Sequence, residues 1–100
     1  MSLVNLSEHE RHVILHCLQA AADGPFFPDW EFRTLFGCER NDIRAIVAAW
    51  PRVDDSDPTV AVAINNAIVN LIGYPHGHDA DLPFERPEIE RVLARWRSAK

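Results

Sequence analysis

Hydrophobic positions recur at helical spacing along most of the chain, and no segment shows the period-two alternation of a half-buried strand. The most apolar stretch, residues 57–73 (DPTVAVAINNAIVNLIG), carries no charge between Pro58 and Gly73. Asp57 is a suitable N-cap, Pro58 suits the first helical position, and Gly73 is typical of a helix end. A helix without charge is usually buried on most sides, so we expect residues 58–72 to form the centre of the fold.

Four further helices are expected around this one. Ser7 and Glu10 have the spacing of a capping box, and Gly37 suits a left-handed helix end. The expected helices run from Ser7 to the Asp23-Gly24-Pro25 stop, from about Pro28 to Phe36, from about Arg40 to Trp50, and from near Pro87 towards the C-terminus. The pattern therefore predicts one all-α domain over residues 1–100, a compact bundle of about five helices around the central uncharged helix.

Composition agrees with a single globular domain, because 47% of the 100 residues are hydrophobic and 25% are charged. Cys17 and Cys38 match neither a disulfide framework nor a paired zinc spacing, so we expect both to be reduced. The N-terminus lacks a basic region followed by an apolar run, and no apolar stretch is long enough to span a bilayer. We therefore expect a cytoplasmic protein of bacterial type that does not interact with membranes.

One side of the central helix carries valines and asparagines but no charged residue, which is unusual for a surface. Val62 and Val69, seven residues apart, form a ridge that Asn65 and Asn66 flank, with Asn70 nearby. A monomer normally places charge on such a face, so this one is expected to meet another surface, either the last helix or a protein partner. Self-association would let an asparagine fix the register across a two-fold axis.

The first half of the chain resembles a helix-turn-helix unit over roughly residues 7–52. In LFGCERNDIRAIVAAW, Gly37 lies where the turn glycine of that motif usually lies, and Cys38 takes the small apolar position after it. The buried positions of a recognition helix are matched by Ile43, Ile46 and Val47.

This resemblance implies DNA binding through Arg40, Asn41 and Arg44 on the groove-facing side, where arginine reads guanine and asparagine reads adenine. Glu39 replaces the usual serine or threonine cap, and Asp42 adds negative charge to the same face. The net charge of −5 also disfavours nucleic acid as a partner. A helix-turn-helix regulator is therefore one alternative function.

The five histidines fall into two clusters, which suggests a second alternative. His12 and His16 have the i,i+4 spacing that places two imidazoles on one metal ion. His76 and His78 lie in a later polar segment and could supply further ligands if that segment reaches the first helix. Zinc or a similar metal is thus the one cofactor that the sequence suggests.

No group of residues has the pattern of a catalytic site, and the four glycines form no phosphate-binding loop. The GPFFPDWEF segment resembles one in other short helical proteins of bacteria, a resemblance that implies no function. The sequence favours a small non-enzymatic helical interaction or regulatory module, with DNA binding and metal binding as alternatives.

Overall fold

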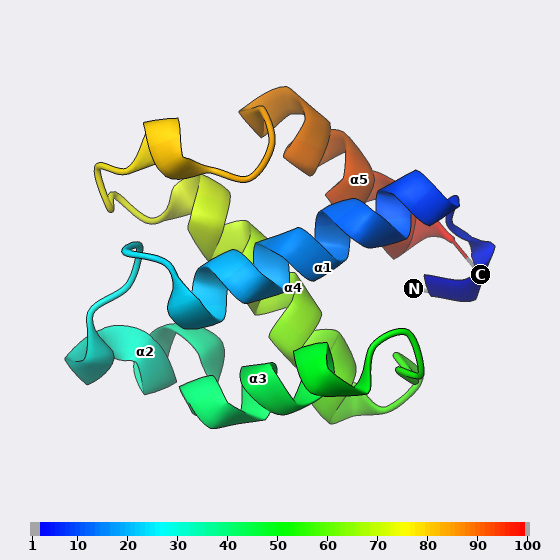
Figure 1. Cartoon of the computed structure of the whole chain (residues 1–100), viewed down its shortest axis with the longest axis horizontal. Coiled ribbons are helices and arrows are strands. Elements are labelled where there is room, and N and C mark those ends of the chain that lie inside the picture. Colours follow the sequence, from blue (N-terminus) through cyan, green and yellow to red (C-terminus); the bar gives the residue numbers. More distant parts are fainter. Residues whose placement is uncertain (1–2, 100) are drawn as a thin grey trace.

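The computed structural model describes residues 3–99, and most of these residues belong to five α-helices (Figure 1). The helices are α1 (Glu8–Asp23), α2 (Asp29–Phe36), α3 (Arg40–Ala49), α4 (Pro58–Gly73) and α5 (Arg86–Ser98). Two short 3-10 turns, η1 (Leu3–Asn5) and η2 (Asp79–Asp81), complete the regular structure. Residues 3–99 contain no strand, so the prediction of an all-α bundle is confirmed.

Helix α4 lies at the centre of the bundle, as its lack of charge predicts. It packs against α1, α2 and α5, while α1 also contacts α3 and α5. In Figure 1, α1 crosses in front of α4, and α3 and α5 lie on opposite sides of this crossing pair. The buried side of α4 consists of Ala63, Ile64, Ala67, Ile68 and Leu71.

Local sequence determines where most of these helices begin and end. The Ser7 hydroxyl accepts a hydrogen bond from the Glu10 N–H (3.1 Å), and the Glu10 carboxylate accepts one from the Ser7 N–H (2.8 Å). Asp57 caps α4 by accepting from the Thr59 N–H (2.9 Å). Gly37 ends α2 with a φ of 72°, a left-handed conformation that glycine adopts without strain. The expected capping box, N-cap and left-handed helix end are therefore confirmed.

The aromatic residues just before α2 and in its first turn divide between the core and the surface. Phe26 and Phe27 are buried, whereas the Trp30 side chain is 79% exposed. The two phenylalanines supply bulk beneath α2, and Trp30 does not take part in the core. Along residues 3–99, no helix is long and apolar enough to cross a membrane.

Candidate functional site: the outer face of helix α4

The side of α4 that faces away from α1 carries exposed aliphatic side chains. Val62 is 50% exposed and Val69 is 37% exposed, and their spacing of seven residues places them on the same side of the helix. The other exposed positions of α4 are Pro58, Thr59 and Gly73. The helix contains no charged residue, so its exposed surface is uncharged. We call this surface the outer face of α4.

The asparagines beside this ridge make hydrogen bonds within the chain. The Asn66 amide donates to the Phe36 carbonyl oxygen (3.0 Å), and the Asn70 amide donates to the Leu35 carbonyl oxygen (3.1 Å). These two oxygens belong to the last turn of α2, where helical carbonyl groups have no partner of their own. Asn66 and Asn70 therefore fasten the end of α2 to α4, which is a structural role.

Asn65 lies on the other side of the ridge and connects α4 with α5. Its Oδ1 atom accepts two hydrogen bonds from the Arg97 guanidinium, from Nε at 3.1 Å and from Nη2 at 2.6 Å. The outer face of α4 thus runs between α2 and α5, and the exposed part of the predicted partner surface is reduced to Val62, Val69 and the edge of Asn65.

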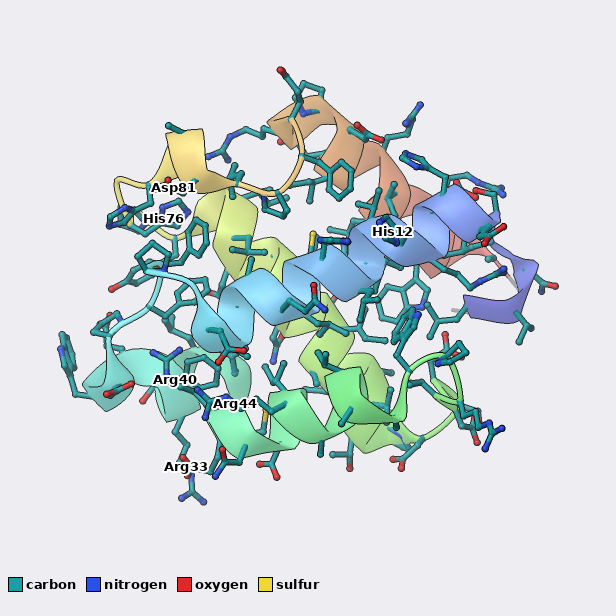
Figure 2. All side chains as sticks on the ribbon, in the orientation of Figure 1. His12, Arg33, Arg40, Arg44, His76 and Asp81 are labelled. Atoms are coloured by element: carbon teal, nitrogen blue, oxygen red, sulfur yellow. The ribbon has the colours of Figure 1, made fainter. Side chains whose placement is uncertain are left out.

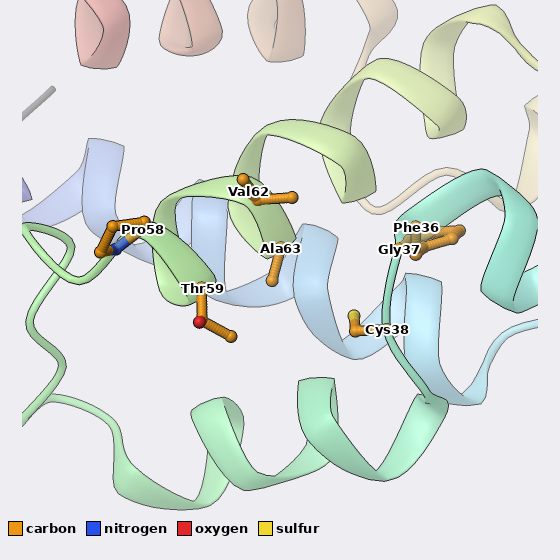
Figure 3. A pocket seen from close by; sticks show the side chains of 7 residues that line it. All are labelled: Phe36, Gly37, Cys38, Pro58, Thr59, Val62 and Ala63. Carbon is orange, nitrogen blue, oxygen red and sulfur yellow. The ribbon is translucent and has the colours of Figure 1, made fainter.

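A shallow groove continues the outer face at the N-terminal end of α4. It has a volume of about 280 Å³ and lies between α4 and the turn that joins α2 to α3 (Figure 3). The groove is lined by Phe36, Gly37, Cys38, Pro58, Thr59, Val62 and Ala63. None of these residues is charged, so the groove extends the uncharged surface beyond Val62.

Neither cysteine has the environment of a reactive thiol. Burial raises the pKa of Cys17 to about 12. Burial raises the pKa of Cys38 as well, and the carboxylates of Asp42 and Glu39 add to this effect. A thiolate is disfavoured at both positions, so Cys38 contributes an uncharged lining to the groove and not a nucleophile.

The expected DNA-reading residues make contacts with other residues of the same chain, and Arg40 makes the most. The Arg40 guanidinium donates to the Ala22 carbonyl oxygen (2.9 Å) and to the Phe27 carbonyl oxygen, and it lies 4.4 Å from the centre of the Phe32 ring. Its Nε also pairs with Asp29 (2.8 Å), and only 19% of the side chain is exposed. Arg40 therefore faces the end of α1, not outward as the helix-turn-helix resemblance implies (Figure 2).

Arg44 and Asn41 remain at the surface next to Arg40. The Arg44 guanidinium pairs with Asp23 at 2.9 Å and donates to the Asn41 amide oxygen at 3.0 Å. Acidic residues thus accompany both arginines, which lowers the positive potential that phosphate contacts require. The structure brings the three residues together, but in contacts that hold α1, α2 and α3 in place.

The two histidine clusters lie on separate parts of the molecule (Figure 2). His12 and His16 are adjacent on α1, with ring centres 4.2 Å apart. His76 packs against Phe26 in the connection after α4, with ring centres 4.9 Å apart. Both of its ring nitrogens are occupied, because Nε2 lies 2.8 Å from the Leu71 carbonyl oxygen and Nδ1 accepts from the His78 N–H (2.9 Å).

The expected four-histidine metal site is therefore not assembled. Within residues 3–99, no group of three or more histidine, cysteine, aspartate or glutamate side chains is placed to hold a metal ion. The connection after α4 does reach α1, but through a different residue: the Phe84 ring lies edge-on to His16 (5.9 Å between ring centres) and to His9 (6.0 Å).

Two features of these surfaces were not predicted from the sequence. The groove beside Val62 combines residues from two separate segments, so no local pattern reveals it. Phe84 is a large apolar residue in a mostly polar connection, and this contrast is the signal in the sequence that it packs on another element. Comparisons with models of protein families, with curated proteins and with solved structures find no match to this chain.

Proposed function

We propose that this chain is a non-enzymatic interaction module that pairs with a second copy of itself through the outer face of α4. The observation that supports the proposal is the exposure of Val62 and Val69 on a helix that has no charged side chain. Covering such side chains with a partner removes apolar surface from water, which favours association.

The positions of Val62 and Val69 along α4 suit pairing with a second copy about a two-fold axis. Along the helix axis, Asn65 lies about halfway between Val62 and Val69. A two-fold axis at this height therefore brings Val62 of one chain close to Val69 of the other. Each copy carries a net charge of −5, which opposes contact between most parts of the two surfaces. The outer face of α4 avoids this repulsion because it carries no charge.

The surroundings of the ridge provide additional contact area. A stable interface usually buries a total of about 1,200–2,000 Å². Helix α4 is about 24 Å long, and two crossing helices alone fall short of that area. The groove beside Val62 offers a recess for an apolar side chain of the second copy, and the Arg97 side chain forms a polar rim near Asn65.

Light scattering after size-exclusion chromatography, at a series of protein concentrations, tests the proposal. We expect a dimer for the wild type and a monomer for the double variant V62K/V69K, because four lysines would then face each other across the axis. Val4 is also exposed but lies on η1, so V4K is the matched control and should remain dimeric. A monomeric wild type at the highest concentration, or a dimeric V62K/V69K, would show the proposal to be wrong.

A further inference from the structure

Two histidines of α1, His12 and His16, lie next to each other on the helix. His12 is exposed and His16 is half-buried, and their ring centres are 4.2 Å apart with the ring planes inclined at 63°. The other three histidines all have ring hydrogen bonds, whereas within residues 3–99 neither His12 nor His16 has one. The nitrogens of this pair are therefore open to a ligand.

We propose that His12 and His16 together bind one late first-row divalent metal ion, of the class that includes Ni²⁺ and Zn²⁺. Residues four apart on a helix are neighbours, and imidazole nitrogen is a preferred ligand for these ions. Because the two ring centres are 4.2 Å apart, each imidazole can direct one nitrogen at a shared ion at the usual metal–nitrogen distance of about 2.0–2.1 Å. Water fills the remaining coordination positions.

Neighbouring side chains hold one of the two ligands in place. The Phe84 ring packs edge-on against His16, which restricts how that imidazole can turn. His9 does not take part, because its Nε2 lies 2.6 Å from the Glu88 carboxylate.

The number of protein ligands sets the expected strength of the site. In the part of the chain that the structure describes, no set of three metal-binding side chains occurs, so this site has two. Its affinity is therefore lower than that of a structural zinc site with four protein ligands. A metal ion that joins two successive turns of α1 also stabilises the folded state, because the unfolded chain does not hold the two rings together.

Isothermal titration of tag-free protein with Ni²⁺ tests the proposal; Ni²⁺ is the probe because, unlike Cu²⁺, it does not oxidise the Cys38 thiol. We expect one ion per chain, tighter binding of Ni²⁺ than of Mn²⁺, and a rise in the melting temperature with Ni²⁺. H12Q and H16Q should each weaken Ni²⁺ binding at least tenfold and abolish the rise. Both positions are on the surface or half-buried, so circular dichroism without metal should match the wild type.

Two control variants separate this pair from the other histidines. H9Q and H78Q should bind Ni²⁺ as the wild type does, because neither ring belongs to the pair. V62K/V69K should also bind Ni²⁺ normally, so a failure of the metal proposal is distinguishable from a failure of the proposed self-association. Absence of Ni²⁺ binding to the wild type, or unchanged binding to H16Q, would overturn the proposal.

Discussion

Asp55 joins three distant parts of the chain through a single oxygen atom. Its Oδ2 accepts a hydrogen bond from the Leu3 N–H (2.8 Å) and another from the Trp96 indole N–H (2.8 Å). Trp96 has no exposed surface, so its N–H has no access to water. One carboxylate in the connection between α3 and α4 therefore fastens both η1 and the last turns of α5.

The substitution D55A should lower the free energy of unfolding by about 2 kcal/mol or more, because it leaves the buried indole N–H of Trp96 without a partner. D54A is the matched control from the same connection, since among residues 3–99 the Asp54 carboxylate accepts hydrogen bonds from Ser56 alone. Urea unfolding at neutral pH measures both variants. An equal loss of stability in D54A and D55A would contradict the role assigned to Asp55.

Individual residues show where the sequence is informative about contacts and where it is not. The partner of Ser7 lies three residues away, so its cap is readable from the sequence. Arg40 occupies a position that a helical wheel assigns to the outside, but its long side chain turns back to carbonyl groups of α1 that lie 18 and 19 positions earlier. Asn66 likewise bonds to a carbonyl 30 positions earlier, and no local pattern specifies such a partner.

At the scale of the helix, both ends of α1 depend on side chains that satisfy its terminal groups. At its start, the Glu10 carboxylate accepts from the Ser7 N–H and, through Oε2, from the Arg95 guanidinium (3.1 Å). At its end, Arg40 donates to the carbonyl groups of Ala21 and Ala22. The helix is thereby fixed at one end to α5 and at the other to α3.

The Glu10 contacts make the stability dependent on pH in the acid range. The hydrogen bond from the Ser7 N–H and then that from Arg95 lower the pKa of Glu10 from 4.5 to about 2. Because the folded-state pKa is the lower one, the stabilisation is complete above pH 4.5 and is lost as the pH falls towards 2. E10Q keeps a capping side chain but does not titrate.

E10Q should therefore be less stable than the wild type above pH 4.5, and the difference should shrink as the pH falls from 4.5 to 2. Urea unfolding at a series of pH values measures this difference. Glu8 lies in the same first turn, and among residues 3–99 its side chain has no hydrogen-bond partner, so E8Q is the control and should follow the wild type. A constant difference across the range would refute the assignment.

At the other end of α1, R40A should lower the free energy of unfolding by about 2–3 kcal/mol, because it removes charged donors from carbonyl groups of α1. R44A removes an exposed ion pair and should cost at most about 1 kcal/mol. Thermal unfolding compares the two variants. Equal and small effects would mean that Arg40 is a surface residue, as the helix-turn-helix resemblance implies.

The helices themselves were more predictable than their contacts. Five helices, the central place of α4 and the burial of Ile64 and Ile68 follow from the spacing of apolar residues, which depends only on the helical period. The separation of the histidine clusters does not follow from it, because contacts between residues far apart in the sequence, such as Phe84 with His16, place residues 74–85. The sequence pattern indicates the exposed ridge of Val62 and Val69 on α4, but not the groove beside it, because the groove combines two separate segments of the chain.

At the scale of the whole molecule, the core is complete within one chain. The buried side chains of η1, the five helices and the segment before α2 form one cluster, and among the described residues no buried side-chain nitrogen or oxygen lacks a partner. Val62 and Val69 are outside this cluster. A monomer can therefore fold alone, and the proposed pairing adds stability to a fold that does not depend on it.

Pairing of folded copies makes the melting temperature depend on protein concentration, whereas folding of a monomer does not. If two copies pair through the outer face of α4, the melting temperature of the wild type should rise with protein concentration, because mass action favours the paired folded state. V62K/V69K should melt cooperatively at a temperature that does not change with concentration, since its core is intact. Differential scanning calorimetry at a series of concentrations measures both. A concentration-independent wild type would argue against pairing, and an unfolded V62K/V69K would mean that the fold depends on the outer face of α4.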